Sequence, residues 1–236
     1  MTKTGTLFLI PTTLAPDTAE YIISPQIKEI ITKTDYFFAE NIRTTRRFIS
    51  ELKLGKKIED LHFFELNKDT STDETEKNID LLLNGHDIGL LSEAGSPGIA
   101  DPGAVAVALA HQKNIPVMAL AGPSAILMAL MGSGMNGQSF VFHGYLPIEK
   151  TARLKMVLQL ETDAYKKNQT QIFMETPFRN NQLLQEIIEN CQSQTKLCLA
   201  CNLTAQDELL KTKTISQWKT QMPDLHKKPT IFLIFR

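Results

Sequence analysis

The sequence of 236 residues has little of what several classes of protein require. Its three cysteines, Cys191, Cys198 and Cys201, are too few and too close together for the disulfide framework of a secreted domain. No apolar run approaches the roughly 20 residues that cross a bilayer. Residues 1–5 also lack the apolar core of a signal peptide. We therefore expect a cytoplasmic protein that has no contact with a membrane.

Residues that could bind a metal are also few, and none has the spacing of a ligand set. The five histidines are scattered along the chain. Cys198 and Cys201 lie three apart in an apolar run that indicates a strand, so their side chains would point to opposite faces. Because no second cysteine pair completes a zinc site, we predict that the protein has no metal and that these cysteines are structural.

Charge of neither sign is in excess, since the formal net charge at pH 7 is -1. A protein with this balance binds nucleic acid only through a local basic face. Arg43, Arg46 and Arg47 fall at i, i+3 and i+4, at the entry and along one side of a helix predicted over residues 44–54. Such a run forms either a solvated surface or a phosphate-binding patch.

What the sequence does contain is a regular alternation of short apolar runs and helical patterns. In the first half, the runs that predict strands are residues 5–10, 35–39, 61–66, 88–91 and 115–120. Their alternation with helices is typical of a parallel sheet covered by helices. The second half contains more strand, at residues 139–143, 171–175, 197–201 and 229–235. We predict two α/β domains, 1–120 and 121–236, with a parallel sheet in the first and a mixed sheet in the second.

The most informative segment covers residues 87–103, where a buried strand passes into a loop of small residues and then into a helix. We predict that Asp101 is the N-cap and Pro102 the first helical residue. A glycine-bearing loop between a strand and a helix N-terminus holds polar or anionic ligands, although an ordinary turn has the same shape. Pro11, Glu40 and Ala121 also follow predicted strands, so these loops are expected to converge at one edge of the sheet.

Four motifs occur in a fixed order: SEAGSPGIADPG at 92–103, AGPSA at 121–125, GYLP at 144–147 and ETP at 175–177. In their residues and in their order along the chain, these motifs resemble those of the tetrapyrrole methylase superfamily, the class III S-adenosylmethionine-dependent methyltransferases. Within it, the chain is most similar to the ribosomal RNA small subunit methyltransferase I group. The resemblance covers about residues 5–180 and implies two α/β domains, a cofactor cleft between them, and a homodimer.

The resemblance also implies an activity: 2′-O-methylation of a cytidine in ribosomal RNA of the small subunit, with S-adenosylmethionine as cofactor. Small residues and backbone carbonyls suit the surroundings of a sulfonium whose charge disappears in the transition state. We therefore predict cofactor contacts in the two small-residue loops, and the resemblance adds contacts from the second half of the chain. The predicted cofactor residues are Pro11, Ser92, Ala94, Gly95, Ser96, Pro97, Asp101, Ala121, Gly122, Ser124, Ala125, Met174 and Pro229.

The acceptor side needs other groups, because a ribose hydroxyl has a high pKa and a base helps to remove its proton. Glu40 and Glu93 are the predicted base or substrate-orienting carboxylates. Arg43 would neutralise a phosphate or position a carboxylate, unless it forms only a local ion pair with Glu40. Arg46, Arg47 and Lys150 are the further predicted substrate contacts.

The chain departs from the family pattern mainly on the acceptor side. Residues 11–16 read PTTLAP where the family has proline-isoleucine-glycine-asparagine-leucine, and Asn41 stands where the family has a second acidic residue. Two alternatives therefore stay open: a methyltransferase for a small, tetrapyrrole-like molecule, and a non-catalytic relative that binds S-adenosylmethionine or RNA. A dinucleotide-dependent oxidoreductase is disfavoured, since no G-x-G-x-x-G motif follows a predicted strand.

Overall fold

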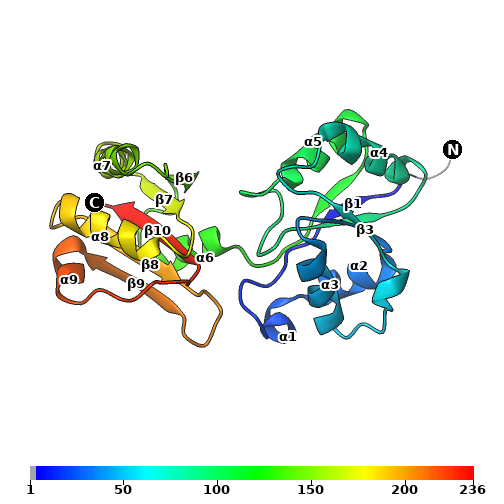
Figure 1. The fold of residues 1–236 in the computed structure, drawn as a ribbon, viewed down its shortest axis with the longest axis horizontal. Coiled ribbons are helices and arrows are strands. Elements are labelled where there is room, and N and C mark those ends of the chain that lie inside the picture. The colour runs from blue at the N-terminus through cyan, green and yellow to red at the C-terminus, as the bar shows by residue number, and fades with distance from the viewer. Residues whose placement is uncertain (1–3) are drawn as a thin grey trace. The chain divides into compact units, whose positions relative to one another are not determined.

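The computed structural model describes residues 4–236 (Figure 1). Its contacts divide the chain into two compact units, one ending at Ser124 and the other beginning at Ala125. Each unit contains its own sheet and its own hydrophobic core. None of the helices among the described residues combines the length and the apolar character that a bilayer crossing requires.

The first unit is built on a sheet of five described strands in the order β3-β2-β4-β1-β5, and every neighbouring pair in it is parallel. The predicted parallel sheet is confirmed, and β4 lies at its centre. All the strands therefore end at one edge. Their bounds are β1 (Leu7–Leu9), β2 (Tyr36–Ala39), β3 (His62–Glu65), β4 (Ile88–Leu91) and β5 (Val117–Ala119).

Helices cover both faces of this sheet, as Figure 1 shows. One face packs against α1 (Ala19–Ile22), α2 (Pro25–Lys33) and α3 (Ile42–Glu51) through residues such as Ile27, Phe37 and Phe48. The opposite face packs against α4 (Thr72–Leu83) and α5 (Gly103–Gln112) through Phe38, Ile79 and Ala106. A short 3-10 helix, Ile58–Asp60, precedes β3. Strands covered on both faces read as continuous apolar runs, which is why the sequence revealed them.

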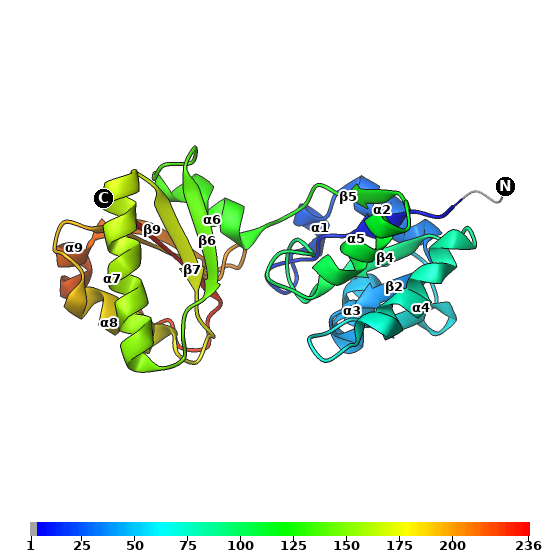
Figure 2. The same ribbon diagram turned by 90° about the horizontal axis from the view of Figure 1, so that it is seen from above.

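The second unit contains a mixed sheet in the order β6-β7-β10-β8-β9, as predicted. Only the β6–β7 pair is parallel. Alternate residues of the central strands face a core formed with α7 and α8, which Figure 2 shows beside the sheet, and α6 packs on the other face. The strands are β6 (Phe140–Tyr145), β7 (Thr170–Met174), β8 (Lys196–Cys201), β9 (Leu209–Thr214) and β10 (Thr230–Phe235), and the helices are α6 (Ala125–Ser133), α7 (Lys150–Lys167), α8 (Asn180–Asn190) and α9 (Ile215–Thr220).

Some elements differ from the prediction. Residues 209–214, which are not among the predicted strands, form β9, an edge strand that pairs only with β8 and so needs no continuous apolar run. Trp218 itself lies in α9, whose start is fixed by a capping box between Thr214 and Gln217. The segment before Ser24 contains the short helix α1, and α7 continues to Lys167 because Ala164 still packs in the core.

The three cysteines are all buried and unpaired by disulfides, in line with their predicted structural role. Cys201 faces the core under α7 and α8, whereas Cys198 lies outside that core cluster. Burial raises the pKa of every one of the three thiols, that of Cys191 to about 12. Thiols held in this protonated form are poor nucleophiles at neutral pH.

Candidate active site at the carboxyl ends of the first sheet

The loops that follow β1, β2, β4 and β5 meet at one edge of the first sheet, as expected. The Thr12 N–H donates to the Gly95 carbonyl at 2.9 Å, which joins the loops after β1 and β4. The Glu93 N–H donates to Oε2 of Glu40, also at 2.9 Å, and this bond adds the loop after β2. Oγ of Ser96 donates to the Pro123 carbonyl at 3.0 Å and adds the loop after β5.

Residues 92–98, here called the β4 loop, fold back sharply because Gly95 and Gly98 have φ values of 76° and 84°. Only glycine adopts this conformation without strain. The Asp101 carboxylate fixes the far end, since it accepts from the Gly98 N–H at 2.8 Å and from the Gly103 N–H at 2.7 Å. The β4 loop is therefore held at both ends before any ligand binds.

The helix after this loop begins later than predicted. The first residue of α5 is Gly103, and Pro102, not Asp101, occupies the N-cap position. The reason is that Asp101 uses its carboxylate to bridge Gly98 and Gly103 across a tight turn in which Ala100 has a φ of 63°. The predicted N-cap role of Asp101 is wrong, although its carboxylate does accept from the first N–H of the helix.

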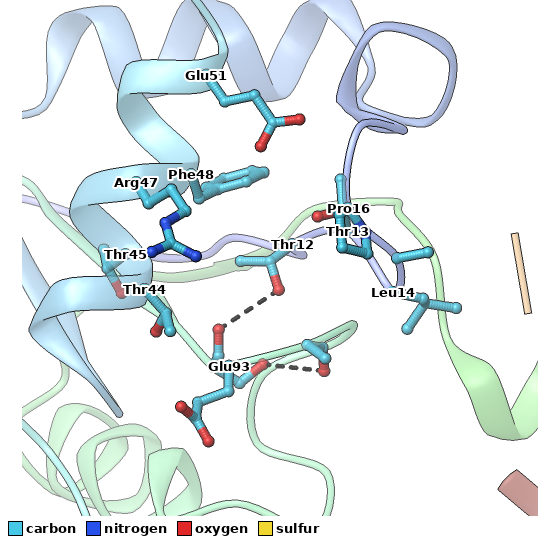
Figure 3. Close-up of a pocket in the computed structure, with 13 residues that line it drawn as sticks. Thr12, Thr13, Leu14, Pro16, Thr44, Thr45, Arg47, Phe48, Glu51 and Glu93 are labelled. Atoms are coloured by element: carbon cyan, nitrogen blue, oxygen red, sulfur yellow. Dashed lines mark hydrogen bonds between the residues drawn. The ribbon is translucent and has the colours of Figure 1, made fainter. Parts of the chain in front are cut away.

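The β4 loop borders at least three hollows of the first unit. The apolar hollow, about 550 Å³, is lined by Pro11, Ser96, Pro97, Gly98 and by residues of α5 and β5. The acidic hollow, about 630 Å³, is lined by Glu40, Asn41, Asn67, Lys68, Glu93 and residues 100–102. The arginine pocket, about 220 Å³, is lined by residues 12–16, by residues 92–94, and by Thr44, Thr45, Arg47, Phe48 and Glu51 of α3 (Figure 3).

The acidic hollow brings the two predicted catalytic carboxylates together. Burial raises the pKa of Glu40, and the negative charges of Asp101 and Glu93 raise it further. The hydrogen bond from the Glu93 N–H acts in the opposite direction but does not cancel the shift. Glu40 therefore holds a proton more readily than an ordinary surface glutamate, which is a property of a base.

Asn41, which stands where the family has a second acidic residue, has a structural role as the N-cap of α3. Its Oδ1 accepts from the N–H groups of Arg43 at 3.0 Å and Thr44 at 3.3 Å, so it caps α3. Within residues 4–236 no ion pair joins Glu40 to Arg43, which removes the local-pair interpretation. The Arg43 side chain is exposed at the start of α3.

The other two arginines of α3 have different surroundings. The Arg46 guanidinium lies over the Phe63 ring, 5.1 Å from its centroid. Arg47 extends from α3 toward the loop after β1 and lines the arginine pocket (Figure 3). The predicted basic run therefore does not act as one patch.

The predicted site residues from the second half of the chain lie as follows. Ala125 begins α6, Met174 ends β7, and Lys150 begins α7. Pro229 immediately precedes β10, and Met174 pairs with Ile231 in the neighbouring strand, so Met174 and Pro229 lie near each other in the second unit. In the first unit, Ala121, Gly122 and Ser124 belong to the turn between β5 and α6, which touches the β4 loop through Pro123.

Sequence reasoning missed part of the site. The apolar hollow has one wall from α5, formed by Ala104, Val107, Ala108 and His111. An apolar helix gives no sign in the sequence of which of its faces lies open. Glu51 was also missed, although its position four residues after Arg47 places the two side chains on the same side of α3.

Comparison with known proteins identifies the class. The model of the tetrapyrrole (corrin/porphyrin) methylases matches residues 18–218, and the chain belongs to that family. It is therefore a methyltransferase, and methyltransferases of this family use S-adenosylmethionine.

Among curated relatives, ribosomal RNA small subunit methyltransferase I of Streptococcus pyogenes is 30% identical over 98% of this chain and 76% of its own length. The protein of the same name from Vibrio cholerae is 28% identical over 90% of this chain and 71% of its own length. Among solved structures, the methyltransferase CobJ has a TM-score of 0.66 at 13% identity and covers 99% of this chain and 95% of its own. The cobalt precorrin-4 methyltransferase CbiF has a TM-score of 0.60 at 14% identity, over 98% and 94%. The similarity to these two solved structures shows that this chain has the same fold.

Proposed function

We propose that this methyltransferase transfers the methyl group of S-adenosylmethionine to the 2′-hydroxyl of a cytidine in ribosomal RNA of the small subunit. One finding supports the choice of acceptor, and another supports the chemistry. Relatives that match nearly the whole chain are named for small-subunit ribosomal RNA. The observation that carries the chemistry is Glu40, a carboxylate of raised pKa in a hollow that shares the β4 loop with the apolar hollow. The homodimer and the cytoplasmic location stay predictions.

The residues of the apolar hollow fit the proposed cofactor. Its volume of about 550 Å³ falls in the range of small-molecule sites, and its walls are mostly apolar. A Cβ added to Gly98 would meet nothing within 4 Å, so the backbone there faces open space. Pro11, Ser96 and Pro97 would hold the cofactor against α5. When bound, S-adenosylmethionine supplies an electrophilic methyl group, and the protein has only to orient it.

The acidic hollow would bind the acceptor nucleotide. Glu40 takes the proton of the ribose hydroxyl at its carboxylate, and the Glu93 N–H fixes the orientation of that carboxylate. The exposed Arg43, whose guanidinium has no acidic partner among the described residues, would contact a phosphate of the RNA. Lys68, which lines the acidic hollow, adds a second cation.

A transfer assay with radiolabelled S-adenosylmethionine tests the proposal. Purified small ribosomal subunits, protein-free ribosomal RNA of the small subunit, and a tetrapyrrole are offered as separate acceptors. We expect label in RNA, resistant to alkaline cleavage at one cytidine because a methylated 2′-oxygen cannot attack its own phosphate. Label only in the tetrapyrrole would establish the small-molecule alternative instead.

Gly122→Ala is expected to weaken cofactor binding at least 10-fold. A Cβ at Gly122 would lie 2.4 Å from Cβ and 2.6 Å from Cγ of Pro11, and the rigid ring of a buried proline cannot move aside. The turn after β5 must therefore shift away from the loop after β1. Isothermal titration with S-adenosylmethionine measures the change. Gly137→Ala is the matched control, because a Cβ there meets nothing within 4 Å. Equal affinities for the two variants would contradict the proposed cofactor position.

Asp101→Asn is expected to move the acid limb of the pH–rate profile to lower pH. The Asp101 charge raises the pKa of Glu40, and a base is lost as the pH falls through its pKa. Without that charge Glu40 stays ionised at lower pH. The asparagine Oδ1 can still accept from Gly98 and Gly103, although its amide NH2 replaces the carboxylate oxygen that lies 2.8 Å from the Gly98 nitrogen. Profiles of kcat/KM give the shift, with the exposed Asp73→Asn as control; an unmoved limb would argue against Glu40 as the base.

A further inference from the structure

The arginine pocket contains polar groups that the methyl transfer itself does not require. Arg47 and Glu51 lie one turn apart on α3, and Figure 3 shows both side chains extending toward the loop of residues 12–16. Within residues 4–236, no hydrogen bond or ion pair involves the Arg47 guanidinium or the Glu51 carboxylate. A guanidinium donor and a carboxylate acceptor thus line the same pocket, and neither is hydrogen-bonded to the other.

The rest of the lining is fixed. The buried Thr12 is held by its N–H bond to Gly95 and by its Oγ1, which donates to the Ser92 carbonyl at 3.4 Å. Thr44 donates its hydroxyl to the Asn41 carbonyl at 3.0 Å. Phe48, 6% exposed, anchors this part of α3 in the core and gives the pocket an apolar wall. Arg47 and Glu51 therefore project from a rigid frame.

The size and chemistry of the pocket favour a single nucleobase. Its volume of 220 Å³ corresponds to about seven water molecules, enough for one planar ring system and too little for a nucleotide pair. A phosphate is disfavoured because the Glu51 carboxylate lines the space and would repel it. A guanidinium donates to a carbonyl oxygen and a carboxylate accepts from an N–H, so the pair matches a base edge that presents both.

The position of the pocket indicates which nucleotide of the RNA, relative to the methylated one, would supply this base. Glu93 lines both the arginine pocket and the acidic hollow, so the two spaces adjoin across a single residue. A nucleotide whose ribose lies beside Glu40 would place a neighbouring base within reach of α3.

We propose that Arg47 and Glu51 read the base next to the methylated nucleotide. They accept guanine or uracil, each of which carries a carbonyl oxygen beside a ring N–H donor, and reject adenine, which has no carbonyl oxygen. This inference rests on the proposed function, because it needs an RNA acceptor. It assigns to this pocket a role in sequence specificity that is separate from catalysis.

The test uses synthetic fragments of the small-subunit RNA that contain the methylated cytidine, once that position has been mapped with the wild-type enzyme. Each flanking base is changed in turn to adenine, and kcat/KM is measured for every fragment. For the wild-type enzyme we expect one flanking position at which adenine lowers kcat/KM about 10- to 100-fold. In Arg47→Ala and Glu51→Ala this discrimination should fall below about threefold.

Arg46→Ala is the matched control. It removes the same charge one residue away, from an arginine that lies over Phe63 instead of in the pocket. It should lower affinity for every fragment equally and keep the discrimination against adenine. The melting temperature and the cofactor affinity of each variant, which should match those of the wild type, check that the substitutions leave the fold intact.

The outcomes separate the two proposals. A wild-type enzyme that methylates no RNA would overturn the proposed function and this inference with it. A wild-type enzyme that methylates RNA but tolerates adenine at both flanks would overturn the inference alone. The same conclusion follows if Arg47→Ala and Arg46→Ala have equal effects on discrimination.

Discussion

Glu40→Gln is expected to lower kcat for methyl transfer about 10²- to 10⁴-fold, the usual contribution of a general base. The glutamine Oε1 can still accept from the Glu93 N–H, so the loops after β2 and β4 stay joined. What is lost is the ability to take a proton. The cofactor affinity should not change, because Glu40 lines the acidic hollow and not the apolar one. Single-turnover rates with saturating cofactor isolate the chemical step.

The control for this variant is Glu65→Gln, which neutralises an exposed carboxylate at the end of β3. It should leave kcat unchanged. If Glu40→Gln retained more than about a third of the wild-type rate, the proton would have to leave by another route. In that case Glu93→Gln, which changes the other carboxylate of the same hollow, should show the large loss instead.

Arg153→Met is expected to destabilise the second unit by about 3–5 kcal/mol, the usual cost of leaving one buried charge without its partner. The Arg153 guanidinium, 2% exposed, makes two hydrogen bonds to the Glu186 carboxylate at 2.7 and 2.8 Å. It also donates to the Ile148 carbonyl at 2.6 Å, which ties the loop before α7 to α8. The pKa of Glu186 is lowered, chiefly by these hydrogen bonds from Arg153, so the variant should lose more stability at neutral pH than in acid.

Trp218 provides the measurement, because it is the only tryptophan and is buried in the second unit with its Nε1 donating to the Leu197 carbonyl. Its fluorescence during urea titration reports the unfolding of that unit. The double variant Arg153→Met with Glu186→Leu removes both charges and should recover most of the loss. Glu29→Gln, which breaks the exposed pair with Lys33, should leave the transition unchanged. A single variant as stable as the wild type would contradict the role of the pair.

The inner strands β2 and β4 of the first unit could be predicted from sequence because they are covered on both faces and are apolar throughout. β9 could not, since an edge strand with one exposed face has the composition LLKTKT, which is typical of a loop as well. Helix starts were predictable where a side chain caps the first turn, as Ser24 does for α2. The start of α5 was not predictable. The Asp101 carboxylate accepts hydrogen bonds from Gly98 and Gly103 across a turn, and the shape of this turn depends on the positive φ of Gly98 and Ala100.

In the candidate site, too, some features could be predicted from the sequence and others could not. Glu40 and Glu93 could be paired from sequence, because residues after parallel strands meet at one edge of the sheet. The different surroundings of Arg46 and Arg47 could not be foreseen, since they depend on where the ring of Phe63 lies in β3. Spacing fixes the angle between side chains on a helix and leaves open what each one meets.

One stretch of backbone, residues 92–98, forms a boundary of the three cavities at once. Under the proposed function, we expect a donor molecule in the apolar hollow to restrain the motion that this stretch retains between its held ends, and so to raise the affinity for the RNA acceptor. By thermodynamic reciprocity, the proposed RNA acceptor would raise the affinity for the donor by the same factor. The demethylated product would then be released most readily after the RNA has left, which predicts an ordered cycle of binding and departure.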